Sequence, residues 1–132
     1  MAIGKIINLS KIIDPRGNLT VVEQNIDVPF EIKRAYWTYD VPSGECRGGH
    51  AHKEQLELLV ALSGSFDVTL DNGKDKETHH LNHPYQGLLI PKMIWRTLED
   101  FSSGAVCLVL ASDLFDEDDY IREYDQYLKE KQ

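Results

Sequence analysis

The sequence has few cysteines, no long apolar stretch and no excess of positive charge. Cys46 and Cys107 are too few for a disulfide framework. No apolar run approaches the roughly 18 residues of a membrane helix, and residues 1–17 lack a signal-peptide pattern, so we expect a cytoplasmic protein without membrane contact. The net charge of −8 argues against nonspecific nucleic-acid binding. A local arginine cluster can still bind a small phosphate ligand.

The remaining composition is that of an ordinary globular protein. Hydrophobic residues make up 42% and charged residues 27% of the 132 residues, and this length predicts a single domain over residues 1–132. Segments rich in β-branched and aromatic residues recur between turn signals, and a spacing of roughly 8–12 residues favours an all-β sandwich or barrel. The strand candidates are residues 4–9, 19–24, 30–41, 56–64, 65–73, 76–82, 104–112, and two strands around Pro91 within 85–100.

The spacing of hydrophobic residues is different in the C-terminal segment. Apolar and aromatic residues recur there every three to four positions, which is typical of a helix. Residues 116–119 are acidic and suit a helix N-terminus, while Lys129 and Lys131 suit a C-terminus. We expect a short helix packed on the barrel, with the acidic residues forming its solvated face. The residues that carry the period are Tyr120, Ile121, Tyr124, Tyr127 and Leu128.

Two histidines one residue apart are the main candidates for chemistry. Residues i and i+2 of a strand face the same side, so His50 and His52 project together. The spacing is Gly44, five residues, His50, one residue, His52, four residues, Glu57, six residues and Gly64. This pattern resembles the first motif of the cupin superfamily. It implies a cupin jelly-roll β-barrel with the C-terminal α-helix added to it.

The expected third metal ligand is replaced. In metal-binding cupins a second motif supplies another histidine, but the matching segment, residues 91–96, has Met93 in place of glycine and Arg96 in place of histidine. Arginine has no lone pair to donate and is permanently cationic. The set of His50, His52 and Glu57 stays open as an iron or zinc site. The preferred interpretation is no metal and no cofactor, with the two histidines as acid–base groups and Glu57 orienting one of them.

Longer stretches resemble one family, the bacterial sugar 3,4-ketoisomerases that act on dTDP-4-keto-6-deoxyglucose. The resemblance covers residues 6–128 and implies a small metal-independent isomerase. It moves the ketone from C4 to C3 of a dTDP-linked sugar on the route to deoxy or amino sugars of surface glycans. It also implies a homodimer in which N-terminal strands are exchanged. The matching stretches are IIDPRGNL, VPFEIKRAYW, RGGHAHK, GLLIP, DFSSG and VLASDLFDEDDYIREYDQYL.

The same motifs imply roles for individual residues. His50 and His52 become the catalytic pair, Tyr36 an active-site residue, Arg47 a substrate or phosphate contact, and Arg16 a residue near the sugar. Arg34 is a further candidate for the diphosphate.

The chain departs from the family at Arg96, where histidine is frequent, and at Glu57, where glutamine is frequent. Both are expected where the sugar lies, so the configuration at C4 of the product stays open. Trp95 and Trp37 are candidates for a thymine slot, with core packing as the alternative.

Three other functions remain as alternatives: a metal-dependent cupin oxygenase, a related dTDP-sugar epimerase, and a non-catalytic sugar-binding cupin. The sequence does not distinguish which histidine is the base. Three observations separate these alternatives. A required metal would indicate the oxygenase, the carbon that exchanges its proton would identify the epimerase, and binding without turnover would indicate the non-catalytic protein.

Overall fold

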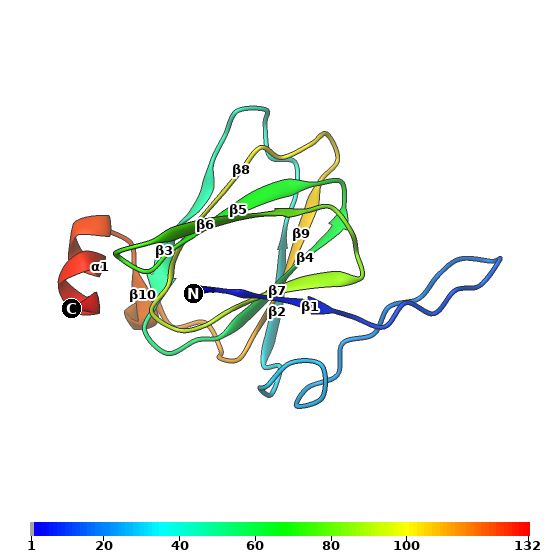
Figure 1. The fold of residues 1–132 in the computed structure, drawn as a ribbon, viewed down its shortest axis with the longest axis horizontal. Coiled ribbons are helices and arrows are strands. Elements are labelled where there is room, and N and C mark those ends of the chain that lie inside the picture. Colours follow the sequence, from blue (N-terminus) through cyan, green and yellow to red (C-terminus); the bar gives the residue numbers. More distant parts are fainter. Residues whose placement is uncertain (1) are drawn as a thin grey trace.

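The computed structural model describes residues 2–132, which form two antiparallel sheets and a short C-terminal helix (Figure 1). The first sheet has the order β1-β7-β4-β9-β2, and the second has the order β10-β3-β8-β5-β6. The strands are β1 Lys5–Asn8, β2 Arg34–Thr38, β3 Arg47–His52, β4 Glu57–Ser63, β5 Phe66–Asp71, β6 Lys76–Leu81, β7 Gln86–Ile90, β8 Trp95–Glu99, β9 Val106–Ala111 and β10 Tyr120–Ile121; a 3-10 helix spans Glu117–Asp119, and α1 spans Tyr124–Lys131. The predicted all-β cupin jelly roll with a short C-terminal helix is confirmed.

The strands alternate in burial because one face of each sheet faces the interior. β9 and β8 bury every second residue, as expected of a sheet with one face against the core. Strand β4 differs, since its first five residues are all buried. Its outer face is covered by the chain around Val28 and Phe30, which packs against Leu58 and Val60. The first sheet therefore has apolar contacts on both faces.

The chain before β2 departs from the prediction. Residues 19–24 were expected to form a strand, but they make only isolated bridges, Ile12 with Leu19 and Gln24 with Val28. This segment finds no neighbouring strand to complete a ladder within the described part of the chain. Residues 9–22, here called the arm, extend away from the barrel (Figure 1).

The chain after β9 also differs in detail. The predicted helical period begins at Tyr120, but α1 starts at Tyr124. The side chain of Asp116 caps the 3-10 helix, and Tyr120 then returns to an extended conformation. As β10, Tyr120 pairs with His52 and Ile121 with Ala51. Residues 112–132 are here called the tail. No helix in residues 2–132 has the length and apolar character needed to cross a membrane.

Candidate active site

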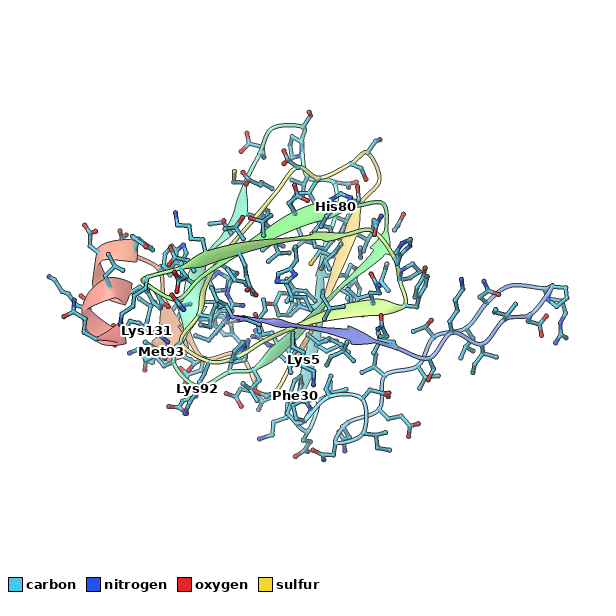
Figure 2. All side chains as sticks on the ribbon, in the orientation of Figure 1. Lys5, Phe30, His80, Lys92, Met93 and Lys131 are labelled. Carbon is cyan, nitrogen blue, oxygen red and sulfur yellow. The ribbon has the colours of Figure 1, made fainter. Side chains whose placement is uncertain are left out.

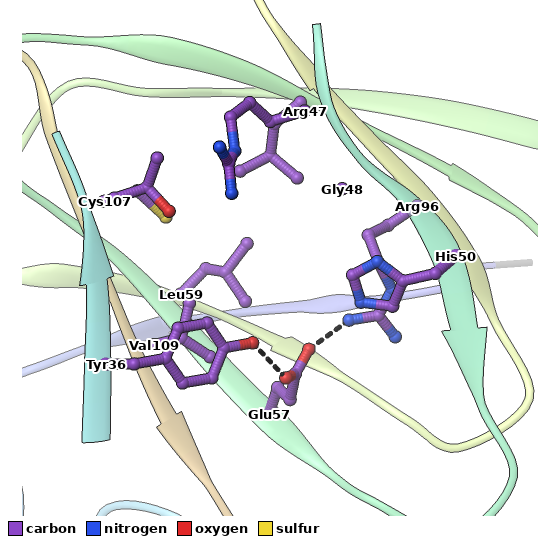
Figure 3. Close-up of a pocket in the computed structure, with 11 residues that line it drawn as sticks. Tyr36, Arg47, Gly48, His50, Glu57, Leu59, Arg96, Cys107 and Val109 are labelled. Atoms are coloured by element: carbon purple, nitrogen blue, oxygen red, sulfur yellow. Dashed lines mark hydrogen bonds and ion pairs between the residues drawn. The ribbon is translucent and has the colours of Figure 1, made fainter. Parts of the chain in front are cut away.

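A cavity of about 80 Å³ lies between the two sheets, inside the barrel (Figure 3). One part of its lining is polar and the other part is apolar. The apolar part includes Cys107. Burial raises the pKa of its thiol to about 12, so Cys107 contributes a neutral side chain to the lining. The lining residues are Tyr36, Thr38, Arg47, Gly48, His50, Glu57, Leu59, Arg96, Leu98, Cys107 and Val109.

Strand β3 carries the two histidines and is bent before it reaches them. Its pairing with β8 shifts register between Arg47 and His50, and His50 then lies opposite Arg96. Gly48 has φ +78°, and a Cβ there would lie 2.9 Å from Leu98 Cδ1. Only glycine meets both conditions at no steric cost. The bulge thus leaves both Arg47 and His50 on the cavity.

The two histidines occupy different environments. His50 lines the cavity, and its buried Nε2 has no hydrogen-bond partner in residues 2–132. Burial, followed by the charge of Arg96 and by His52, lowers the pKa of His50 to about 3. His50 is therefore a neutral imidazole with a free nitrogen. His52 is 0% exposed and is not among the cavity-lining residues.

His52 lies between two carboxylates. Its Nδ1 is 3.1 Å from Asp119 Oδ2, and its Nε2 is 3.4 Å from Glu57 Oε2. Its ring meets that of His50 edge to face, with 4.8 Å between centroids. The tail thus supplies a partner for one nitrogen of His52, and the barrel supplies a partner for the other.

Glu57 and Arg96 form a buried ion pair at the end of the cavity. Arg96 Nη1 donates to Glu57 Oε1, and Oε2 accepts from Tyr36 Oη and Gln55 Nε2, each at 2.7 Å. Burial raises the pKa of Glu57, but Arg96, with help from His52 and Tyr36, lowers it well below its usual range. Burial and the nearby Glu57 raise the pKa of Tyr36. The site thus contains a fixed carboxylate, a fixed guanidinium and a protonated phenol.

The donors of a cupin metal site are close together but already engaged. Ligand atoms of His50, His52 and Glu57 lie within 4.8 Å of one another. Both oxygens of Glu57 accept hydrogen bonds, and Arg96 contacts one of them. A divalent cation would meet that guanidinium and would have to displace it. The residues present therefore do not fit a metal centre.

The structure brings together most of the predicted site residues and separates two of them. His50, Tyr36, Arg47, Glu57 and Arg96 line one cavity, with His52 packed behind His50.

Trp95 lies elsewhere, 5.3 Å from the ring of Tyr124 and 5.8 Å from that of Tyr127, between centroids. Arg16 lies on the arm, with 90% of its side chain exposed and paired with Asp14. These substrate-binding roles stay predictions.

Sequence reasoning missed three residues of the site. Asp119 and Gln55 contact His52 and Glu57, and the ring of Tyr120 lies 4.4 Å from that of His52 and 5.2 Å from that of His50, between centroids. The prediction that the acidic residues of the tail form a solvated helix face is wrong for Asp119, whose side chain is 12% exposed. The distinctive tail motif was the only signal for Asp119 and Tyr120, and no quoted motif contains Gln55.

Comparisons with known proteins identify the family of the chain. The family model described as "FdtA: WxcM-like, C-terminal" matches residues 3–132. The chain is 47% identical to the TDP-4-oxo-6-deoxy-alpha-D-glucose-3,4-oxoisomerase of Aneurinibacillus thermoaerophilus over 125 residues, 95% of this chain and 90% of that protein. This chain belongs to the FdtA-type sugar 3,4-ketoisomerase family. The resemblance inferred from the sequence motifs is confirmed.

Solved structures of sugar 3,4-ketoisomerases share the fold over nearly the full length. QdtA from Thermoanaerobacterium thermosaccharolyticum, as a mutant in complex with TDP-4-keto-6-deoxyglucose, superposes with a TM-score of 0.96 at 40% identity, covering 99% of this chain and 95% of that one. The WlaRB TDP-quinovose 3,4-ketoisomerase from Campylobacter jejuni has a TM-score of 0.91 at 48% identity, covering 96% and 97%.

Proposed function

We propose that this protein is a sugar-nucleotide 3,4-ketoisomerase that converts dTDP-4-keto-6-deoxyglucose into a dTDP-3-keto-6-deoxyhexose. The observation that carries the proposal is His50, a neutral imidazole that lines a cavity beside a buried guanidinium and whose Nε2 has no hydrogen-bond partner in residues 2–132. A general base must be unprotonated and within reach of the proton that it removes. The named relatives act on, or are bound to, sugar nucleotides of this kind.

The proposed reaction transfers protons without a change in the net oxidation state of the sugar. The C4 ketone acidifies the C3 proton, and His50 removes it to give an enediolate. Transfer of the O3 proton to O4 and protonation at C4 then leave a hydroxyl at C4 and the ketone at C3. Arg96 lies on the same cavity, and its positive charge is placed to stabilise the oxyanion, whereas the one proton of Tyr36 Oη is donated to Glu57 Oε2. Negative charge on the enediolate would also favour a protonated His50.

Substrate binding is proposed to use the arginines near the cavity. Arg47 lines it and is exposed, so it is available to a diphosphate. The guanidinium of Arg34 lies 4.9 Å from the centroid of the Tyr36 ring and donates to Gln55. The position of Trp95 against Tyr124 favours its packing role over a thymine slot.

Three alternatives predict different results with the same substrate. A metal-dependent oxygenase needs a divalent ion at Glu57, where Arg96 already binds. An epimerase exchanges the proton of a carbon whose configuration it inverts, without moving the ketone. A non-catalytic sugar-binding protein binds the nucleotide sugar without any exchange.

The decisive experiment is NMR of the product formed from dTDP-4-keto-6-deoxyglucose in deuterated water. We expect the ketone at C3 and deuterium at C4, with activity that survives a chelator. The same spectra give the configuration at C4. A ketone that stays at C4, or activity that depends on added metal, would contradict the proposal.

His50→Asn tests the assigned base. We expect turnover to fall by about 10²–10⁴-fold, the usual contribution of a general base, while TDP binding is retained. His52→Asn is also expected to impair turnover, and comparing the two variants would assign their roles. A native rate for His50→Asn would remove this residue from the mechanism.

The arm is proposed to exchange between the two subunits of a homodimer. Ile12, Ile13 and Leu19 are 54%, 78% and 53% exposed on it, which is costly for a segment standing free in water. At its base lies a groove of about 500 Å³ with walls that include Leu62 and Leu108. A second copy of this chain offers the same arm and the same groove, as a two-fold interface requires. Sedimentation of a clean monomer would contradict the exchange.

A further inference from the structure

Asp119 is fixed against the loop that follows the two histidines. Its Oδ1 accepts a hydrogen bond from the backbone N–H of Glu54 at 2.8 Å, and its Oδ2 lies 3.4 Å from the backbone nitrogen of Gln55. Its own carbonyl oxygen accepts from the N–H of Lys53 at 2.9 Å. These contacts connect the 3-10 helix of the tail to the connection between β3 and β4. The carboxylate is therefore held in one orientation.

The same carboxylate reaches His52. Asp119 Oδ2 lies 3.1 Å from Nδ1 of the ring, and a carboxylate can only accept, so Nδ1 carries the proton. The other nitrogen, Nε2, then faces Glu57 Oε2 at 3.4 Å and Gln55 Nε2 at 3.5 Å. The partner of one ring nitrogen sets the tautomer and the ring orientation. Asp119 does this for His52.

The environment of His52 leaves little freedom for other arrangements. The ring is 0% exposed and packs against His50 on its own strand and against Tyr120 of β10. The charged groups near it are Asp119 from the tail, Glu57 from β4 and, through Glu57, Arg96 from β8. Because the His52 ring packs against His50 and lies beside Glu57, a shift of His52 would disturb the positions of both residues.

We propose that Asp119 is a positioning residue of the active site, which fixes the tautomer and orientation of His52 and through it the placement of His50 and Glu57. The inference rests on the proposed ketoisomerase function, because the placement of His50 and Glu57 affects the rate only if the protein catalyses that reaction. It assigns to the acidic tail a role in catalysis in addition to its packing on the barrel.

The size of the effect follows from how far Asp119 lies from the reacting atoms. A carboxylate that orients a histidine ligand of a metal typically contributes about 10- to 100-fold. In a Ser-His-Asp triad, where the histidine itself transfers the proton, the loss is about 10⁴-fold. Because His52 does not line the cavity, the smaller figure applies here.

The test is Asp119→Asn, which keeps an oxygen acceptor for the backbone N–H groups of the loop. The matched control is Asp118→Asn, which removes the same charge from an exposed position on the same 3-10 helix. For each variant we would measure kcat and KM with dTDP-4-keto-6-deoxyglucose, the dissociation constant of TDP, and the ¹⁵N chemical shifts of the His52 ring.

In Asp119→Asn, we expect kcat to fall about 10- to 100-fold, with TDP affinity unchanged and altered Nδ1 and Nε2 shifts for His52. Asp118→Asn is expected to match the native protein in all three measurements. A native kcat in Asp119→Asn would overturn the inference. Loss of both kcat and TDP binding with native His52 shifts would also overturn it, because the role would then be structural. If the native protein itself fails to isomerise the sugar, the proposed function fails, while the ring shifts still test the contact.

Discussion

The arm and the tail both leave the barrel, but only the tail folds back onto the site of the same chain. The tail adds β10 to the edge of the second sheet and places Asp119 against His52. The arm extends away from the barrel (Figure 1) and leaves apolar side chains in solvent. Its Arg16 is 90% exposed and is not among the residues that line the cavity. The tail is therefore folded against its own barrel, whereas the apolar side chains of the arm have no cover within the same chain.

The tail is fixed by one buried aromatic residue. Tyr127 is 0% exposed, and its hydroxyl lies 2.8 Å from Met93 O and 3.0 Å from Asp71 O. Met93 stands at the glycine position of the second cupin motif and has φ +58°, and its N–H donates to His52 O at 2.7 Å. Figure 2 labels Met93 beside the helical end of the molecule. Tyr127 therefore stabilises the turn that leads to Arg96.

The largest expected effect is that of Tyr127→Ala. Removal of a buried aromatic side chain costs about 3–5 kcal/mol, and we expect the free energy of unfolding to fall by that amount. Chemical denaturation monitored by circular dichroism measures it. Tyr127→Phe keeps the ring and loses only the hydroxyl, so about 1–2 kcal/mol is expected. Equal losses in the two variants would contradict the packing role of the ring.

Substitutions in the arm should change the association of two copies and not the stability of the single subunit. Ile13→Ser combined with Leu19→Ser removes exposed side chains, so the stability of the single subunit should change little. If these side chains are buried by a second copy, each contributes about 1.5–3 kcal/mol to association. We expect the dimer dissociation constant to rise by several orders of magnitude in sedimentation experiments. A native dissociation constant would show that the arm does not hold the dimer together.

The two residues that precede β1 are held by the carboxylate of Glu77. Glu77 accepts from the N–H of Ile3 and the N–H of Gly4 at 3.0 and 2.7 Å, and it lies 2.9 Å from His79 Nε2. Burial raises the pKa of Glu77, but these hydrogen bonds lower it from 4.5 to about 2. A group whose pKa is lower in the folded state stabilises that state above the unfolded pKa.

We expect Glu77→Gln to lower the free energy of unfolding by about 1–2 kcal/mol near neutral pH, as for charge-assisted hydrogen bonds on a partly exposed group. The difference from the native protein should disappear as the pH falls from 4.5 to about 2, because the native carboxyl is protonated in that range. Asp75→Asn, a charge change at a nearby exposed position, is the control. A difference that is independent of pH would exclude the carboxylate as its source.

The sequence was sufficient for the parts of the site that follow from local pattern. Alternation placed His50 on the interior face, and the replacement of a histidine by Arg96 already argued against a metal. It could not separate His50 from His52, because that difference depends on a β-bulge at Gly48 and on contacts from the tail. Asp119 was missed because an acidic residue near a helix is usually solvated, and its partner lies 67 residues away in sequence.

The smallest expected effect concerns Arg16 and tests whether the arm reaches the other subunit's site. The backbone N–H and Nε of Arg16 donate to Asp14 Oδ1, which fixes the tip of the arm. If exchange brings Arg16 to a partner's substrate, Arg16→Ala should raise KM about tenfold, the equivalent of one charge-assisted hydrogen bond. The melting temperature should not change, because the side chain has no contact with the barrel to lose. Lys11→Ala removes a charge from the same arm and should leave KM unchanged; equal KM values in the two variants would confine the arm to a role in assembly.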